Sequence, residues 1–372
     1  MKSARKLWTS GWTQAGVAVV AFVLAATLLW WRGPDWGSVL DAFSLVIWSW
    51  IILAFALNVL STLFRALSWR LTVGQALPPE HQPKLVHVLS SFGVGLLANA
   101  IVPGRLGELA RVATLRRHLP DAPPGTSATL VGTVFAHRLF DLVPASLLVV
   151  WVLLTAEVPH WAVVSITIAA AVGFAMFTVA WLGAKRNDRP VVSEGMGSIR
   201  ELVSMGRQGL SVLKAPVPLA GAILLQCLGW LMQLLAVFVA MQAFGIDAPL
   251  PAAGLVLVLM NIATIIPLWP GNIGLVQAAV ALPLRNYGVA YPVGFAYGIV
   301  LQAIEIACGI TLGLIAIARE GISVAMLRRM EDDERSSENA VDGVHELIED
   351  LEEGNPPPQD SEAAREGAAV SR

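Results

Sequence analysis

The amino-acid sequence predicts an all-α, polytopic helical membrane protein with about six full spans and two shorter hairpins. Of its 372 residues, 56% are hydrophobic and 14% are charged, whereas a soluble domain carries about 25% charged residues. The apolar residues form long blocks, several near the roughly 20 residues that cross a bilayer as a helix. A helical fold is the default because lipid cannot satisfy a sheet edge, and the alternating pattern of a membrane barrel is absent.

Six apolar blocks are expected to cross the membrane completely. They lie near residues 13–31, 43–64, 128–155, 161–183, 217–244 and 293–318. The first block follows Lys2, Arg5 and Lys6, as in a signal peptide, but it ends in two tryptophans and Arg32 without a small-residue cleavage pattern. We therefore predict an uncleaved first span, preceded by a short cytoplasmic N-terminus at residues 1–12.

The block at 128–155 differs from the others because it contains His137, Arg138 and Asp141. Its uncharged part, residues 142–154, is too short to cross a bilayer alone. The sequence therefore predicts that this helix carries ionisable groups into the membrane.

Two further apolar stretches, 85–102 and 253–269, are each followed by a Pro-Gly turn and a shorter return segment. The turns are similar, PGRLG at 103–107 and PGNIG at 270–274. If both hairpins re-enter the side from which they start, nearly all loop arginines and lysines lie on one side, as the positive-inside rule expects. We therefore predict oppositely oriented re-entrant hairpins near 85–119 and 253–284, an inverted repeat typical of transporters. The alternative is a chance match of two common loop turns.

The same charge count places both termini in the cytoplasm and bounds a membrane domain at 13–320. The cytoplasmic loop at 184–216 has a possible interfacial helix. From Glu331 to the end the chain carries 14 acidic and 3 basic residues, so residues 321–372 are predicted to be an acidic, disordered cytoplasmic tail with a possible cytoplasmic partner. Cys227 and Cys308 both fall in apolar spans and do not indicate a disulfide or metal site.

The first hairpin carries the clearest candidate binding site. The free backbone N–H groups at the start of its return leg form an anion site, and the arginine on the turn can hold a phosphate with two hydrogen bonds. The alternative is an ion pair between Arg105 and Glu108 that only closes the turn. The candidate residues on this hairpin are Asn99, Gly104, Arg105, Gly107, Glu108 and Arg111.

On the charged span, Arg138 and Asp141 are three residues apart and can pair, while His137 lies at the edge of the same face. Such groups in a span are functional candidates, although a structural ion pair between hairpin and helix is an equal alternative. Secondary candidates are His137 and, in the second half of the chain, Asn272, Gln277 and Glu305. Asn58 and Asn99 lie inside apolar runs, where asparagine more often makes interhelical hydrogen bonds.

Signatures of enzymes are missing from the sequence. It contains no zinc-protease His-Glu-x-x-His, no Gly-x-Ser-x-Gly, no paired aspartates within a span and no ATP-binding Walker loop. We therefore expect no cofactor, no bound metal and no nucleic-acid partner, and we expect a protein that is not an enzyme.

At these residues the chain resembles the lysylphosphatidylglycerol synthase transmembrane-region family, the flippase-like relatives of the membrane half of the multiple-peptide-resistance factor. The segment 95–118, GLLANAIVPGRLGELARVATLRRH, is similar to that family's Asn-x-x-x-Pro-Gly-Arg-x-Gly-Glu-x-x-Arg signature. Segments 64–73 (FRALSWRLTV), 136–143 (AHRLFDLV) and 265–280 (IIPLWPGNIGLVQAAV) follow in the expected order. The aminoacyl-transferring domain of bifunctional relatives is not in this chain.

The resemblance implies lipid flipping, with motif residues facing an anionic head group; it carries over to Asn99, Arg105, Glu108, Arg111, Arg138 and Asp141. Three positions depart from the family. His137 and Gln277 replace acids that are usual there, and Gln302 stands where an arginine is common. If those acids carry protons in relatives, coupling in this chain must differ or be absent.

Our leading hypothesis is a lipid transporter of the bacterial cytoplasmic membrane that flips an anionic or phosphate-bearing lipid or glycolipid between leaflets. One alternative is an intramembrane lipid-modifying enzyme that uses His137 and Asp141 as an acid/base pair. Another is a non-catalytic membrane subunit whose acidic tail recruits a partner.

Overall fold

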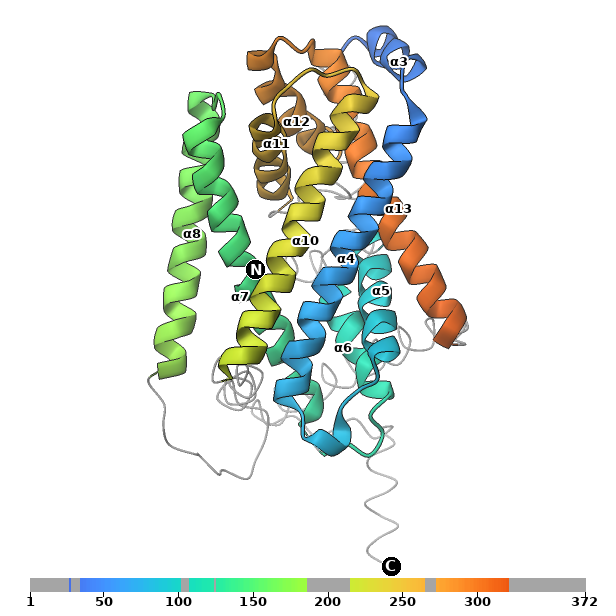
Figure 1. The fold of residues 1–372 in the computed structure, drawn as a ribbon, viewed down its shortest axis with the longest axis vertical. Helices are drawn as coiled ribbons and strands as arrows, with labels where there is room; N and C mark the ends of the chain where they lie inside the picture. The colour runs from blue at the N-terminus through green and yellow to red at the C-terminus, as the bar shows by residue number, and fades with distance from the viewer. Residues whose placement is uncertain are drawn as a thin grey trace, which may run out of the picture. The chain divides into compact units, whose positions relative to one another are not determined.

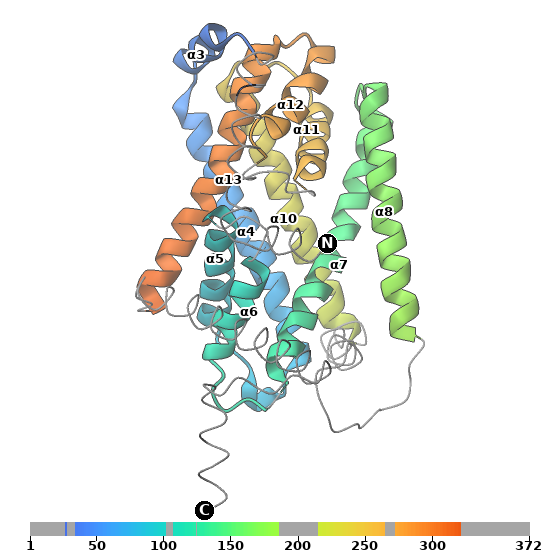
Figure 2. The ribbon, with the colours of Figure 1, turned by 180° about the vertical axis from the view of Figure 1, so that it is seen from behind.

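The computed structural model describes Thr27 and residues 34–101, 107–123, 125–185, 215–264 and 272–320. The chain divides into two compact units, Met1–Ala316 and Ile317–Arg372, and the arrangement given below is that of the first unit. Its described part contains helices and no strand, which confirms the predicted all-α class. Figures 1 and 2 show these helices from opposite sides.

Four of the described helices are long and apolar enough to cross a membrane. They are α4 (Trp48–Ala76), α7 (Thr126–Thr155), α10 (Pro216–Ala243) and α13 (Tyr291–Glu320). A further apolar helix, α8 (His160–Lys185), corresponds to the span predicted at 161–183. The first predicted span lies outside the described residues apart from Thr27.

Helices α4 and α10 pack against each other in antiparallel orientation. The backbone N–H of Ile47, just before α4, donates to the carbonyl of Ala243, the Ser61 hydroxyl donates to the carbonyl of Gly229, and Ser68 donates to Ala222. Each step forward along α4 is thus matched by an equal step backward along α10. These hydroxyls satisfy their hydrogen-bonding capacity across the helix interface, as polar groups within a membrane must.

The boundary of α4 differs from the prediction of a span at 43–64. A separate short helix, α3 (Trp36–Ser44), comes first, with Asp35 capping its N-terminus through a hydrogen bond from Gly37. Helix α4 begins at Trp48 and continues to Ala76. Because the helix continues past Phe64, it carries Arg65 and Trp69 on its length instead of in a loop. A 3-10 turn, η1 (Pro79–His81), then leads to the first hairpin.

The first hairpin consists of α5 (Leu85–Ile101) and α6 (Gly107–Arg117). The two legs approach so closely that a Cβ atom added at Gly107 would lie 2.0 Å from the carbonyl oxygen of Gly95. The backbone N–H of Gly107 donates to Oδ1 of Asn99 at 2.9 Å. The remaining turn residues, 102–106, lie outside the described part of the chain, and they include the predicted site residues Gly104 and Arg105.

The second hairpin consists of α11 (Leu250–Ala263) and α12 (Leu275–Leu284), followed by a 3-10 turn, η4 (Arg285–Tyr287). Its turn is described from Asn272 onward. Asn272 has a positive φ of 45°, and its side-chain amide donates to the carbonyl of Ala263 at 2.8 Å. This bond joins the end of one leg to the beginning of the other, as Asn favours in turns.

The two hairpins occupy opposite ends of the long helices (Figures 1 and 2). Helices α5 and α6 lie beside the end at which α4 finishes and α7 starts, whereas α11 and α12 lie beside the end at which α10 finishes and α13 starts. Each hairpin enters and leaves at the same end. Each also has its own apolar core, the first including Trp69, Phe92, Leu115 and Leu130, the second Leu255, Val280 and Tyr297.

Helix α13 contacts both hairpins through pairs of glycines spaced four residues apart. A Cβ atom added at Gly313 would lie 2.3 Å from Cβ of Leu97 on α5, and one at Gly298 would lie 3.0 Å from Cα of Gln277 on α12. Small residues at this spacing let membrane helices pack at close range. The same helix therefore positions both hairpins. The predicted interfacial helix within 184–216 and the tail at 321–372 fall on residues that are not described, apart from the helix ends at 184–185 and 215–216.

Candidate functional site

Arg111, a predicted site residue of the first hairpin, is buried against aromatic side chains. It lies one helical turn after Glu108 on α6 and is 3% exposed. Its guanidinium stacks over the rings of Trp69, at 4.7 Å from the centroid, and Phe92, at 5.4 Å. Its Nη2 lies 2.7 Å from Oε2 of Glu108. The aromatic faces and one carboxylate together stabilise a cation that would otherwise be costly to bury.

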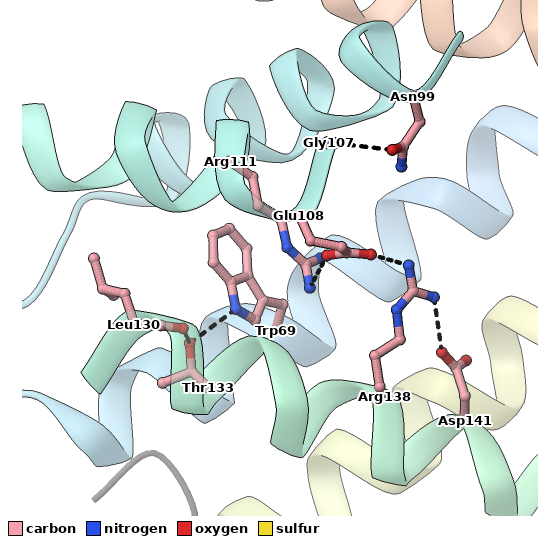
Figure 3. A network of polar contacts seen from close by, with 9 residues as sticks. All are labelled: Trp69, Asn99, Gly107, Glu108, Arg111, Leu130, Thr133, Arg138 and Asp141. Carbon is pink, nitrogen blue, oxygen red and sulfur yellow. Dashed lines mark hydrogen bonds and ion pairs between the residues drawn. The ribbon is translucent and has the colours of Figure 1, made fainter. Parts of the chain in front are cut away.

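Arg138 on α7 connects the first hairpin to the charged helix. Its Nη2 pairs with Oε1 of Glu108, and its Nη1 lies 3.4 Å from Oδ2 of Asp141 (Figure 3). The side chain of Arg138 remains 54% exposed, so it faces an open space while making these contacts. The Arg138–Asp141 pair expected from their spacing is present, and it forms part of an ion-pair chain that ties hairpin to helix.

Asp141 in turn connects α7 to α10. Its Oδ1 accepts a hydrogen bond from Nε1 of Trp230 at 2.8 Å and another from Nε2 of Gln226. A carboxylate inside a membrane needs such donors because no water replaces them. Both oxygens of Asp141 are thus occupied by groups from its own helix and from α10.

A second polar chain, of which the sequence analysis had named Glu305 alone as a candidate, runs from α4 to α13. Arg65 donates through Nη2 to Oε1 of Gln233, and Nε2 of Gln233 donates to Oε1 of Glu305 at 3.1 Å. The guanidinium of Arg65 lies over the ring of Trp230, 5.3 Å from its centroid. Trp230 therefore contacts both chains, with its N–H on Asp141 and its face on Arg65.

Buried hydrogen bonds also fix the aromatic wall behind Arg111. Trp69 is fully buried, and its Nε1 donates to Oγ1 of Thr133 at 3.1 Å, while the Thr133 hydroxyl donates to the carbonyl of Leu130 (Figure 3). These bonds join α4 to α7 and hold the Trp69 ring in one orientation. The position of the Arg111 guanidinium is thereby set by α4 and α7 as well as by its own helix.

The two chains line one cavity of about 290 Å³ between α4, α5, α6, α7, α10 and α13. Three arginines and two acids line it, and a third acid, Glu108, contacts two of those arginines. The polar residues that line it include Asn58, Arg65, Asn99, Arg111, Arg138, Asp141 and Glu305. Within a membrane domain this is a site that can accept an anionic group.

Most of the predicted site residues of the first half come together here. Asn99, Arg111, Arg138 and Asp141 line the cavity; Gly107 and Glu108 lie directly behind it through their bonds to Asn99 and to the two arginines. The Gly107 N–H, one of the donors expected to bind an anion, already has Asn99 as its acceptor. The predicted secondary residues His137 and Glu305 also line the cavity. His137 is buried, edge-on to the ring of Phe92.

The remaining secondary candidates, Asn272 and Gln277, do not line this cavity but organise the second hairpin. Oε1 of Gln277 accepts from the backbone N–H of Gly274 at 2.6 Å, and its Nε2 donates to Oε1 of Gln302 on α13 at 2.6 Å. Gln277 and Gln302, which both depart from the family pattern, are therefore direct hydrogen-bond partners. Because both side chains are neutral amides, this contact between α12 and α13 is a hydrogen bond between uncharged groups.

Sequence reasoning missed Arg65, Gln226, Trp230 and Gln233 as site residues. The last three are spaced four and three residues apart on α10, which puts them on one face of a helix. This polar stripe in an otherwise apolar span was a signal that could have identified them. Among the described residues, no group of three His, Cys, Asp or Glu side chains is placed to hold a metal ion.

Comparison with known proteins relates the chain to a family and to a membrane protein. Residues 14–313 match the family model described as the lysylphosphatidylglycerol synthase TM region. A UPF0104 membrane protein of Methanothermobacter thermautotrophicus is 22% identical over 288 residues, which cover 73% of this chain and 82% of that relative. No solved structure matches the chain.

Proposed function

Because the chain belongs to the lysylphosphatidylglycerol synthase transmembrane-region family of membrane proteins involved in lipid biology, we propose that it flips a lipid with an anionic or phosphate-bearing head group between membrane leaflets. The observation that carries this proposal is the cavity of about 290 Å³ lined by Arg65, Arg111 and Arg138. Arginine suits phosphate because its planar guanidinium offers paired donors and stays charged when desolvated. A head group held there would lie deep inside a bundle of membrane-spanning helices.

The two hairpins supply a route by which such a site could open to each side. We propose that both are re-entrant and that they approach the bilayer midplane from opposite faces, as in transporters built from inverted repeats. Supporting this, each hairpin enters and leaves at one end of the long helices. Alternate displacement of the hairpins against α13 would expose the arginines to one leaflet and then to the other.

We propose a bacterial cytoplasmic membrane and a cytoplasmic position for the end that carries the first hairpin. The basic residues Arg70, Lys84, Arg116 and Arg117 belong to the segments at that end, whereas Arg285 is the single basic residue in the described loops at the other. An excess of arginine and lysine marks the cytoplasmic side. Both termini would then be cytoplasmic, where the acidic tail could meet a soluble partner.

Transport accounts for the geometry better than lipid-modifying catalysis does. A general acid or base must be free to exchange a proton with the bound substrate. Both oxygens of Asp141 are already occupied by contacts with Arg138, Gln226 and Trp230, and the His137 side chain is buried. We therefore propose a protein that binds and moves its lipid without changing it.

A leaflet-exchange assay tests the proposal. Purified protein is reconstituted into phosphatidylcholine vesicles that contain fluorescent phosphatidylglycerol or phosphatidic acid, and dithionite reports the fraction in the outer leaflet. The wild type should expose nearly all of the label to dithionite, and Arg65→Gln should leave about half protected, as in protein-free vesicles. The matched control Arg70→Gln changes an exposed arginine on the same helix and should flip like the wild type. Full protection of the inner-leaflet label with wild-type protein, for both lipids, would refute lipid flipping.

A further inference from the structure

Glu305 differs from the other carboxylates around the cavity because, among the described residues, its nearest cation, Arg65, is separated from it by the side chain of Gln233. Glu108 contacts both Arg111 and Arg138, and Asp141 contacts Arg138. For Glu305, no basic group of the described residues lies within ion-pair distance, and its partner is the neutral amide of Gln233. The ionised form of Glu305 is stabilised by the Gln233 amide and, beyond it, by Arg65, so it becomes costly when another anion binds at Arg65, and a bound proton removes that cost.

Gln233 connects Glu305 to the nearest arginine of the cavity. The oxygen of its amide accepts from Arg65 and the nitrogen donates to Glu305, an orientation that the chemistry requires because a guanidinium only donates and a carboxylate only accepts. Arg65 lines the cavity, and a guanidinium has five N–H donors, of which the bond to Gln233 uses one on Nη2. Arg65 can therefore also donate to a ligand in the cavity, and a single side chain, that of Gln233, connects it to Glu305.

The charges of the described cluster balance when the cavity is empty. Three arginines, 65, 111 and 138, face three acids, Glu108, Asp141 and Glu305. An anionic head group with one charge would leave an excess of one negative charge inside the membrane. Arginine does not lose its proton in proteins, and two of the acids are already held by arginines. One proton on Glu305 would restore neutrality.

We propose that Glu305 takes up one proton when an anionic head group binds at Arg65 and releases it when the head group leaves, which couples lipid movement to proton movement. This inference rests on the proposed function. The step is the protonation of a carboxylate to a carboxylic acid, with the proton drawn from and returned to water. Its amide partner accommodates both forms, because a carboxyl oxygen can accept from Gln233 in either state.

Other titratable or charged groups face the same cavity and must be separated from Glu305 in any test. They are Arg65 on α4, Arg111 on α6, three residues of α7 (His137, Arg138 and Asp141) and, on α13 itself, Cys308. Of these, His137 is the group that could also gain a proton on acidification, because the arginines are already charged and Asp141 is held by Arg138 and two donors. A variant of His137 is therefore the necessary comparison.

The first experiment measures equilibrium binding of fluorescent phosphatidylglycerol to the purified protein in neutral detergent between pH 5 and pH 9. If one proton is taken up with each lipid, the affinity of the wild type should weaken by up to about tenfold for each unit by which the pH is raised, over the range in which Glu305 ionises. Glu305→Gln should bind with an affinity that does not change with pH. Glu80→Gln, an exposed acid outside the cavity, should keep the wild-type slope, and His137→Gln should keep the slope whatever its affinity. A slope that persists in Glu305→Gln, or that disappears in His137→Gln alone, would overturn the assignment.

The second experiment uses the wild type alone, so it stands even if Glu305→Gln fails to fold. A pH-indicator dye in weak buffer should report uptake of about one proton per phosphatidylglycerol bound near the pH where Glu305 ionises, and no uptake would overturn the proposal. In vesicles, an imposed pH gradient should shift the label toward the alkaline side. If flipping occurs but the pH gradient does not change the distribution of the label, proton coupling is refuted and the proposed lipid flipping still stands. If no flipping occurs, the proposed function itself is refuted.

Discussion

Replacing Gly107 by alanine should separate the two legs of the first hairpin. The new Cβ atom would lie 2.0 Å from the carbonyl oxygen of Gly95 and 2.5 Å from Oδ1 of Asn99. Non-bonded heavy atoms are comfortable at about 3.5 Å, so the backbones of α5 and α6 must move apart by roughly 1.5 Å. Neither of the two backbones can rotate out of the way as a flexible side chain could.

The expected cost has two parts. Overpacking of a close interface costs about 1–3 kcal/mol, and the bond from the Gly107 N–H to Asn99 contributes about 1 kcal/mol when it is lost. Together they predict a loss of about 2–4 kcal/mol in the free energy of unfolding. Since Glu108 is the next residue, the shift also moves the carboxylate that contacts Arg111 and Arg138. The affinity for lipid should therefore decrease together with the free energy of unfolding.

Reversible unfolding in mixed detergent and SDS micelles, followed by circular dichroism, measures this free energy. The matched control is Gly74→Ala on α4, where an added Cβ would meet only the end of the Gln82 side chain, 3.9 Å away. There the better helix propensity of alanine should gain up to about 1 kcal/mol. The two substitutions are thus expected to change stability in opposite directions. A Gly107→Ala protein that unfolds within about 0.5 kcal/mol of the wild type would show that the legs are not packed this closely.

Two other substitutions test contacts between helices. Trp230→Phe keeps an aromatic face beneath Arg65 but removes the N–H that donates to Asp141. Because Gln226 still donates to that carboxylate, the free energy of unfolding should fall by about 1.5 kcal/mol. An unchanged free energy of unfolding would mean that the Trp230 N–H does not stabilise the carboxylate. A double-mutant cycle of Gln277→Ala and Gln302→Ala should give a coupling energy of about 0.6 kcal/mol, typical of interhelical hydrogen bonds in membranes, and additive effects would show that the pair is not formed.

The periodicity and composition of the chain were enough to predict its class and most of its elements. Long apolar blocks have few alternatives in lipid, because only helices satisfy their own backbone there. The charges of the span at 128–155 were placed correctly in a helix, since its uncharged part is too short to cross alone. The pairing of Arg138 with Asp141 followed from local spacing, which the helix fixes without help from the rest of the fold.

Contacts between distant segments were not readable in this way. The span was predicted to end at Phe64, just before Arg65, yet α4 continues to Ala76, and its buried Ser68 and Trp69 make hydrogen bonds to α10 and α7. A pair between Glu108 and Arg105 was one alternative, and Arg105 lies outside the described residues; the contacts of Glu108 with Arg111 and Arg138 were not anticipated. Which arginine meets which acid depends on how the hairpin packs against α7, and local spacing carries no information about that packing.

The glycines of α13 are a second case in which the sequence does not identify the packing partner. Their four-residue spacing is visible at Gly294 and Gly298 and again at Gly309 and Gly313, and it indicates close helix packing without naming the partner. Only the tertiary structure assigns one pair to α12 and the other to α5. The sequence by itself determined helices, turns and the residues that bear charge. The tertiary structure decided that two polar chains meet at Trp230 around one cavity, because that meeting depends on which helix faces are pressed together.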